Sequence, residues 1–257
     1  MSKFFCQIYD AGKPYFPEEP DLEQLLRSGK ILKDSPTTCA ALVTLPCGKE
    51  VFLKRNNNKS LRFTLRYIFR KARVFRAAQA AIWLEEIGIP TPQVYLAAEY
   101  RKFGFLKAGY IATDTIPGIC AFSLLLHDSE KPGELLETFF DKAAEFCARL
   151  HRNNLEHGDL KLVNFYWDGT QYGIWDLDSV RRWENGIPQK NVDEELSRII
   201  SFLYRMKMTA IPEEWQDHYA TAKRLTGLYQ KYAPELYHPT PEAILTFAEK
   251  RLRRKRP

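Results

Sequence analysis

The stretch LEHGDLKLVN, residues 155–164, constrains this chain more than any other part of its sequence. It places Asp159 directly after a His-Gly pair, with a lysine two residues later and an asparagine five residues later. A second stretch, GIWDLDS at residues 173–179, is an apolar run that ends in two acids. Phosphoryl transfer from ATP requires a carboxylate that orients the attacking hydroxyl, a cation on the moving group and oxygen ligands for Mg²⁺. The two stretches therefore predict a phosphotransfer site.

The two stretches resemble the catalytic loop and the metal-binding loop of the protein-kinase-like superfamily. The pattern HGDL, rather than HRDL, is similar to the small-molecule branch, which includes aminoglycoside and choline kinases. Within that branch the chain, from about residue 30 to residue 205, most resembles the bacterial lipopolysaccharide core kinases, the Kdo and heptose kinase family. The resemblance implies an α+β, bilobal fold, with a small antiparallel-sheet N-lobe at residues 1–116 and a mainly helical C-lobe at residues 117–257.

The resemblance assigns a role to each polar residue of the two stretches. Asp159 would be the base that orients the hydroxyl, Lys161 would stabilise the transferring phosphoryl group, and His157 completes the catalytic set. Asn164 and Asp176 would bind Mg²⁺. Taken singly, these residues are typical of a polar turn and of a strand that runs into an acidic loop. Their joint occurrence, in order and after a helix, favours the site.

Three features near these stretches receive supporting roles. Asp178 would point away from the metal if its strand continued, which makes it a structural or substrate-side residue. His151 ends a helix predicted over residues 134–152 and is interpreted as structural, because no partner stands at ligand spacing. The run Glu195-Leu196-Ser197-Arg198 resembles the DLxRL helix that supports the catalytic loop, with Glu in place of Asp.

Lys54 ends an apolar strand, VFLK, in the manner of the kinase lysine that holds the ATP phosphates. The alternative is an ordinary surface lysine at the end of a strand. A glycine-rich loop should precede this lysine, yet residues 34–38, DSPTT, contain no glycine. Ala77 stands where related sugar kinases carry a helix glutamate, and the nearest candidates are Gln79, Glu85 and Glu86. These departures keep a nucleotide-binding pseudokinase scaffold as an alternative function.

Adenine recognition is predicted from position alone. Strands are expected at residues 94–98 and 110–115, with a turn at residues 102–107. Backbone groups near Thr113, Asp114 and Thr115 would meet the adenine edge, and Pro117-Gly118 would mark the boundary between lobes. Other patterns predict a helix after an Asp21 cap, a hairpin at 40–45 and 50–54, and helices at 77–87, 192–206, 215–232 and 240–252.

The segment from Lys54 to Arg76 carries a dense positive charge without any acid. Its apolar and basic residues both recur at helical spacing, which predicts a basic amphipathic segment of one or two helices. The net charge of +6 favours an anionic partner, and the segment itself fits a surface that meets such a partner and a solvated basic face about equally. The segment also argues against the cationic acceptors of aminoglycoside and choline kinases. The basic residues are Lys54, Arg55, Lys59, Arg62, Arg66, Arg70, Lys71, Arg73 and Arg76.

The expected partners are the lipopolysaccharide core or a similar anionic glycolipid, together with an anionic membrane surface. No recognised module accompanies the charge, so nucleic acid is not expected. No apolar run reaches the ~20 residues of a membrane span, and the first residues lack a signal-peptide pattern. The predicted location is cytoplasmic and peripheral, at the inner face of the bacterial inner membrane. The predicted function is an ATP- and Mg²⁺-dependent kinase acting on a hydroxyl of Kdo or heptose.

Overall fold

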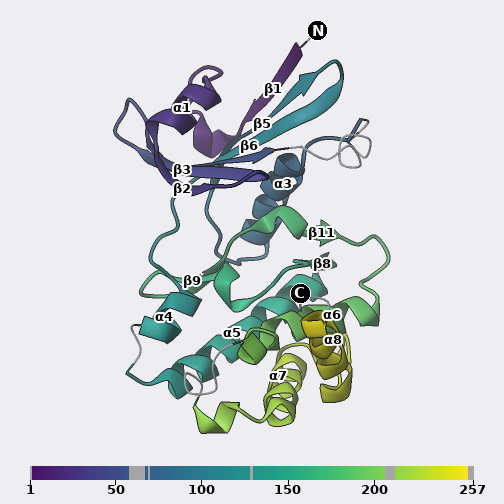
Figure 1. The fold of residues 1–257 in the computed structure, drawn as a ribbon. Coiled ribbons are helices and arrows are strands. Elements are labelled where there is room, and N and C mark those ends of the chain that lie inside the picture. The colour runs from purple at the N-terminus through teal and green to yellow at the C-terminus, as the bar shows by residue number, and fades with distance from the viewer. Residues whose placement is uncertain (1, 58–66, 69, 128–129, 206–211, 254–257) are drawn as a thin grey trace. The chain divides into compact units, whose positions relative to one another are not determined.

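The computed structural model describes residues 2–57, 67–68, 70–127, 130–205 and 212–253 (Figure 1). The chain divides into two compact units. The first contains Met1–Trp83 and Thr91–Ile116, and the second contains Leu84–Pro90 and Pro117–Pro257. Residues 84–90, assigned to the N-lobe by the sequence, therefore group with the second unit.

The first unit is built on a six-stranded antiparallel sheet with the strand order β1-β5-β6-β4-β3-β2. Side chains alternate between the two faces of such a sheet, so each face can pack against a different helix. The strands are β1 (Ser2–Ile8), β2 (Lys30–Asp34), β3 (Thr38–Thr44), β4 (Glu50–Asn57), β5 (Val94–Lys102) and β6 (Phe105–Thr113).

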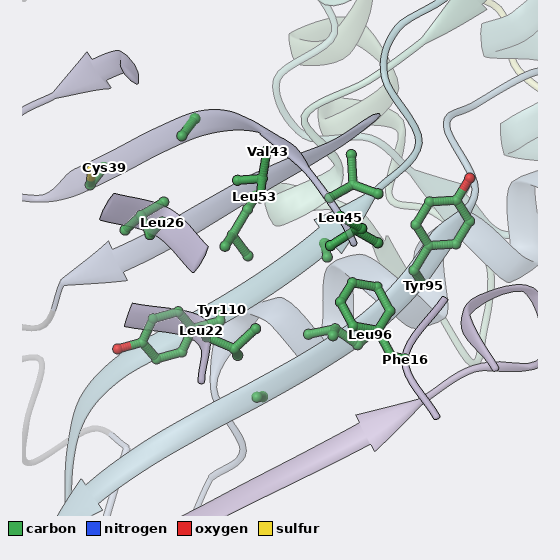
Figure 2. Close-up of a cluster of buried hydrophobic side chains, with 14 of the residues drawn as sticks. Phe16, Leu22, Leu26, Cys39, Val43, Leu45, Leu53, Tyr95, Leu96 and Tyr110 are labelled. Carbon is green, nitrogen blue, oxygen red and sulfur yellow. The ribbon is translucent and has the colours of Figure 1, made fainter. Parts of the chain in front are cut away.

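Helix α1 (Leu22–Ser28) packs against one face of this sheet. The helix begins at Asp21, whose carboxylate accepts hydrogen bonds from the N–H groups of Glu23 and Gln24, as an N-cap does. Leu22 and Leu26 join a buried cluster with alternate residues of the strands, such as Val43, Leu53 and Leu96 (Figure 2). The predicted cap, helix and β3–β4 hairpin are therefore confirmed.

Helix α3 (Arg73–Glu86) packs against the opposite face of the sheet. A Cβ atom at Gly109 of β6 would lie 3.2 Å from Ala72, which shows how closely the strand approaches the start of this helix. Lys54 follows Leu53 on β4, and the alternation of the strand therefore directs its side chain toward the α3 face. The helix ends before Gly88, which adopts a left-handed conformation with φ +69°.

The second unit is mainly helical. Phe139, Phe140, Phe165 and Trp215 meet at its core, with ring centroids 4.8–5.6 Å apart between contacting pairs. Its helices are α4 (Ala121–His127), α5 (Pro132–Arg152), α6 (Gln189–Ile200), α7 (His218–Tyr232) and α8 (Pro241–Arg253). Its short strands form two small sheets: β7 (Ile119–Cys120), β9 (Phe165–Trp167) and β10 (Tyr172–Ile174) in one, β8 (Leu155–Glu156) and β11 (Arg181–Arg182) in the other.

Several predicted boundaries were wrong. Strands β5 and β6 continue through the expected turn at residues 102–107 and leave only Phe103 and Gly104 between them. Helix α3 begins four residues earlier than the predicted start at residue 77, and α6 begins at Gln189 and ends at Ile200 instead of spanning 192–206. Strand β1 and helix α4 were not predicted at all.

The middle of the predicted basic amphipathic segment, including Lys59, Arg62 and Arg66, lies outside the described residues. The prediction was wrong for residues 54–57, which continue strand β4, whereas the end of the segment is helical from Arg73, where α3 begins. Among the helices of the described chain, none combines the length and the apolar character needed to cross a membrane.

Candidate active site

The loop that carries Asp159 lies in the second unit, between strand β8 and a 3-10 turn at Leu162–Asn164. Gly158 precedes the aspartate with φ +77°, a conformation that L side chains rarely adopt. A Cβ atom at this position would lie 2.9 Å from the Ser179 carbonyl oxygen. Both the conformation and the close approach explain why glycine occupies the middle position of the HGD motif.

Glu195 of helix α6 fixes the backbone of this loop. Its Oε1 accepts a hydrogen bond from the Gly158 N–H at 2.7 Å, and its Oε2 accepts one from the His157 N–H at 3.2 Å. The carboxylate is fully buried. These contacts agree with the prediction that the helix carrying Glu195 supports the catalytic loop. The glutamate, one methylene longer than the aspartate of the DLxRL pattern, reaches both amide groups.

His151 supports Glu195 from the end of α5. Its Nε2 lies 3.0 Å from Glu195 Oε2 and its Nδ1 lies 2.9 Å from the Tyr229 hydroxyl, with all three side chains buried. Burial would raise the pKa of Glu195, but the hydrogen bond with His151 and the nearby positive charges hold that pKa below its ordinary value. His151 thus has the structural place predicted for it.

His157 is also fully buried. Burial lowers the pKa of its imidazole, although the carboxylates of Glu195, Asp159 and Asp176 act in the opposite direction. The neutral ring can accept the Asp159 N–H through Nδ1, at 3.4 Å. The side chain of His157 has no exposed surface and therefore lies behind the loop, and the catalytic role that the resemblance assigned to it stays a prediction.

Asp159 and Lys161 form a direct ion pair. Lys161 Nζ donates to Asp159 Oδ2 at 2.6 Å, and both side chains are 38% exposed. Partial exposure leaves the second carboxylate oxygen and the remaining ammonium protons within reach of a bound substrate. The pair therefore presents a carboxylate and a cation side by side, and the catalytic roles of Asp159 and Lys161 stay predictions.

Asn164 and Asp176 are joined through the hairpin of strands β9 and β10. Ile174 pairs with Phe165 in this hairpin, and the next residue, Trp175, donates its N–H to the Asn164 carbonyl at 3.0 Å. Asp176 follows at once with φ 59° and ψ 57°. A left-handed aspartate is uncommon and is found where a turn must direct a side chain.

Asn164 and Asp176 carry side-chain oxygens of the kind that bind Mg²⁺. Asn164 Nδ2 donates to the Asp159 carbonyl at 2.9 Å, which fixes the amide and turns Oδ1 away from that bond. Amide and carboxylate oxygens are ligands that Mg²⁺ prefers, with phosphate oxygens and water completing its shell. In the described chain no group of three or more His, Cys, Asp or Glu could hold a metal by itself. The side-chain oxygens of Asn164 and Asp176 are of the type that Mg²⁺ binds, so these two residues fit the predicted metal site.

Asp178 does not occupy the predicted strand. Strand β10 ends at Ile174, and Asp178 lies in a 3-10 turn at Leu177–Ser179. The strand-based reason for its direction was therefore wrong, because the left-handed Asp176 interrupts the extended backbone.

Glu156 is a buried residue of the site that the sequence did not reveal. It precedes His157 and accepts hydrogen bonds from Arg181 Nε at 2.9 Å and Trp183 Nε1 at 3.0 Å. These bonds tie strand β8 to the segment that follows the metal loop. Nothing in its polar surroundings, Asn153-Asn154-Leu155-Glu156-His157, marked this acid as buried, because its partners stand 25 and 27 residues away.

Lys54 and the candidate adenine-binding residues belong to the first unit. Lys54 is half-buried in β4, on the face covered by α3, where Ala77 is buried and Gln79 is exposed. The Asp114 N–H donates to the Gln93 carbonyl, and the Thr115 N–H donates to Asp114 Oδ1. Two N–H groups of this segment are therefore already used, so an adenine contact here would depend on carbonyl oxygens. The roles of Lys54, Thr113, Asp114 and Thr115 stay predictions.

The glycine-free loop before β3 is held by its own hydroxyl groups. Ser35 Oγ donates to the Thr38 carbonyl at 3.0 Å and accepts the Thr38 N–H at 3.1 Å. The Asn57 N–H donates to the Thr37 carbonyl at 2.8 Å. The loop is therefore tied at both ends by hydrogen bonds of Ser35 and Asn57, and a contact between it and phosphate stays a prediction.

Residues 37–219 match the lipopolysaccharide kinase (Kdo/WaaP) family. The chain belongs to this family. The matched range contains Lys54, the catalytic loop, the metal loop and Glu195, so the predicted resemblance is confirmed. No curated protein sequence matches the chain.

A solved structure described as WaaP in complex with acyl carrier protein is similar in fold. It is 14% identical, with a TM-score of 0.64, and the similarity covers 97% of this chain and 98% of that chain. At this identity the likeness shows the fold alone, and it confirms the predicted kinase-like α+β architecture. In all, 1866 solved chains resemble this fold, so the fold does not select an acceptor. Family membership makes the chain a phosphotransferase with an alcohol group as acceptor.

Proposed function

We propose that the chain transfers the γ-phosphoryl group of ATP to a hydroxyl of Kdo or heptose in the lipopolysaccharide inner core. The observation that carries this proposal is the Asp159–Lys161 pair, 2.6 Å apart and partly exposed. The pair stands on a loop whose backbone is fixed by the buried Glu195. A fixed carboxylate beside a cation can act on a hydroxyl without first being ordered.

In the proposed reaction Asp159 orients the acceptor hydroxyl and accepts its proton. The hydroxyl oxygen forms a bond to the γ-phosphorus while the bond from that phosphorus to the β-phosphate oxygen breaks. Lys161 donates hydrogen bonds to the phosphoryl oxygens and balances their charge. The products are ADP and the phosphorylated sugar, with the proton initially held by Asp159.

Nucleotide binding would involve three further side chains and one backbone segment. Asn164 Oδ1 and the Asp176 carboxylate would hold Mg²⁺, which neutralises charge on the phosphates when it is bound. Lys54 would bind the phosphates, and the carbonyl groups near Thr113–Thr115 would meet the adenine edge. The buried His157 and Glu156 hold the loop and its neighbour but would not touch the nucleotide.

An anionic glycolipid acceptor is supported by charge. The chain has a net charge of +6, and Arg70, Lys71, Arg73 and Arg76 succeed one another without an acid. Such a surface repels the cationic acceptors of aminoglycoside and choline kinases and attracts the carboxylates and phosphates of a lipopolysaccharide core.

We also propose a peripheral location at the inner face of the inner membrane. The tip of the β5–β6 hairpin presents Phe103, which is 69% exposed, and Phe105, which is 39% exposed. Lys102 Nζ lies 5.8 Å from the centre of the Phe103 ring. Exposed aromatic rings beside cations are typical of surfaces that bind anionic lipid headgroups. Phe103 has φ +53°, a costly conformation for an aromatic residue, which suggests that the ring is retained at this apex for a function.

The function can be tested with purified protein, ATP, Mg²⁺ and a core oligosaccharide that lacks the phosphate. Mass spectrometry should detect the addition of one phosphoryl group to a Kdo or heptose residue. Asp159→Asn is the matched control and should leave the oligosaccharide unmodified over the same period. Tight nucleotide binding without transfer to any core sugar would instead support a scaffold.

A further inference from the structure

A strongly basic hollow lies in the first unit, where the end of β1 meets the start of α3. Its volume is about 380 Å³, within the range of small-molecule sites. Four cations line it, together with the polar side chains of Gln7 and Tyr9, and its described lining contains no acid. The cations are Arg70, Lys71, Arg73 and Arg76.

Two side chains of strand β5 hold the backbone that carries these cations. Arg101 of β5 donates to the Tyr67 carbonyl at 2.9 Å and to the Arg70 carbonyl at 2.7 Å. Glu99, two residues earlier on the same strand, accepts the Ala72 N–H at 2.8 Å. The backbone before α3 is therefore fixed before any ligand arrives, which reduces the entropy lost on binding.

Glu99, whose carboxylate contacts the backbone of the lining residue Ala72, is already paired with another cation. Glu99 is buried and accepts a hydrogen bond from Arg101 Nε at 2.7 Å, so its charge is balanced by Arg101. Within the described part of the chain neither Arg70 nor Lys71 forms an ion pair. Lys71 Nζ instead lies 5.6 Å and 5.5 Å from the ring centres of Phe5 and Phe75. Ring faces attract a cation but leave its net charge in place.

We infer that this hollow binds a phosphate-bearing group, either on a membrane lipid or glycolipid or on a soluble molecule. Guanidinium groups match phosphate oxygens in a two-bond geometry, and an adjacent ammonium adds charge. Phe75, which also lines the hollow, offers an apolar wall to the sugar or acyl part that carries the phosphate. The four cations are those whose charge supports the anionic acceptor proposed above, but none of the lining residues belongs to the catalytic or metal loops, so phosphate binding here can be measured without phosphotransfer.

The probe for this site is inorganic pyrophosphate, measured by calorimetry without ATP, Mg²⁺ or acceptor. The variant Arg70→Gln/Arg76→Gln removes two charges from the hollow. The control Lys30→Gln/Lys33→Gln removes two charges from β2, which is the opposite edge strand of the same sheet. We expect the hollow variant to bind pyrophosphate about tenfold more weakly than the wild type and the β2 control to bind it as the wild type does.

A second arm identifies the source of the phosphate. The wild type and the variants are sedimented with anionic phosphatidylglycerol vesicles and, as the uncharged comparison, with phosphatidylcholine vesicles. If the group is a lipid headgroup, the variants that bind pyrophosphate weakly should also bind the phosphatidylglycerol vesicles weakly. If Arg70→Gln/Arg76→Gln weakens the binding of pyrophosphate but not of vesicles, the ligand is a soluble molecule. If it weakens the binding of both, the ligand is a lipid headgroup. Lys71→Gln, a milder change, should lower affinity in the same direction, and melting temperatures establish that each variant is folded.

The inference is overturned if neither pyrophosphate nor anionic vesicles bind the wild type. It is also overturned if the hollow variants bind both probes as the wild type does, because the phosphate would then bind elsewhere, for instance at Lys54. Equal losses in the hollow variant and the β2 control would show a general effect of net charge and would likewise remove the site. Because no transfer is measured, a failure here leaves the proposed phosphotransfer step at Asp159 untouched, and that step is tested separately with the core oligosaccharide.

Discussion

The Gly158 N–H donates a 2.7 Å hydrogen bond to Glu195 Oε1, and this bond connects the catalytic loop to helix α6. The second oxygen of the same carboxylate accepts the His157 N–H and contacts His151. Asp159 thus follows two residues whose backbone positions are fixed by one buried acid. Glu195 therefore fixes the backbone that leads into Asp159, and the 2.6 Å contact with Lys161 then holds the Asp159 side chain.

Glu195→Gln should strongly destabilise the second unit. One amide oxygen cannot replace two carboxylate oxygens that serve three partners, and the amide NH₂ group would face donors. Disrupting such a buried charged network costs about 3–5 kcal/mol in the free energy of unfolding. Urea denaturation at pH 7 measures this loss. Glu194→Gln, the same change at the neighbouring half-buried position, should stay within about 0.5 kcal/mol of wild type.

The same variant should alter the pH dependence of stability. The pKa of Glu195 is lowered in the folded state from an ordinary value of 4.5, so its ionised form contributes stability above pH 4.5. That contribution is lost as the pH falls through the lower folded-state pKa. Below pH 4.5 the unfolding free energy of the wild type should therefore fall more steeply than that of Glu195→Gln. Parallel curves for the two proteins would contradict the assigned role of this carboxylate.

Gly158→Ala should be destabilising for two separable reasons. The residue has φ +77°, and the added Cβ would lie 2.9 Å from the Ser179 carbonyl oxygen. Gly169→Ala is the control, because Gly169 has φ +99° but no atom within 4 Å of an added Cβ. Urea denaturation should show that Gly169→Ala lowers the free energy of unfolding by about 1 kcal/mol, from backbone strain alone. Gly158→Ala should lower it by about 2–3 kcal/mol. Equal losses would show that the contact with Ser179 relaxes without cost.

Local signals predicted those parts of the fold that depend on nearby residues. Asp21 starts α1, the Pro-Cys-Gly-Lys turn joins β3 to β4, and the apolar spacing of residues 139–150 defines α5. The order of residues in the catalytic loop also led to the choice of Asp159, Lys161 and Asn164, whose roles stay predictions. Each of these features is determined within a few positions of the sequence.

The parts that could not be predicted depend on partners far along the chain. Strand β1 is mostly exposed and lacks an apolar alternation, so only its pairing with β5, some 90 residues later, makes it a strand. The Phe103-Gly104 turn lacks the usual Asn-Gly or Asp-Gly signal and was therefore missed. Glu156 was missed because Arg181, its main partner, has no spacing relation to it.

Phe103 and Lys102 should both contribute to the binding of anionic vesicles, but only the contribution of Lys102 should depend on salt. Phe103→Ser removes an exposed ring at the hairpin tip and should weaken binding by about tenfold at both low and high salt. Lys102→Gln should weaken it at low salt only, because the charge is screened at high salt. Ile31→Ser on β2, a change at a residue that is 48% exposed, should have no effect. Identical behaviour of Phe103→Ser and Ile31→Ser in sedimentation would exclude the hairpin tip.

Asp176→Asn should reduce Mg²⁺-dependent nucleotide binding while the fold is retained. Asparagine tolerates the left-handed conformation of Asp176, whereas alanine would add backbone strain to the loss of the ligand. The amide keeps an oxygen but loses the negative charge that Mg²⁺ requires, so we expect at least a tenfold loss of Mg²⁺-dependent ATP affinity by calorimetry. Asp178→Asn, two residues later, is the control. If Asp176→Asn transfers phosphate at the wild-type rate, Asp176 is not a metal ligand.

Asp159→Asn should separate chemistry from binding. The side chain keeps its size but cannot take the proton of the sugar hydroxyl, and general-base assistance typically contributes 10²–10⁴-fold to the rate. Its pair with Lys161 is 38% exposed on each side, so breaking it should change the unfolding free energy by less than about 1 kcal/mol. We therefore expect unchanged ATP affinity and melting temperature, with turnover on the core oligosaccharide lower by about 10²–10⁴-fold. If the mutant and the wild type transferred phosphate equally fast, another group would have to accept the proton, and the Asp159–Lys161 pair would lose its central place in the mechanism.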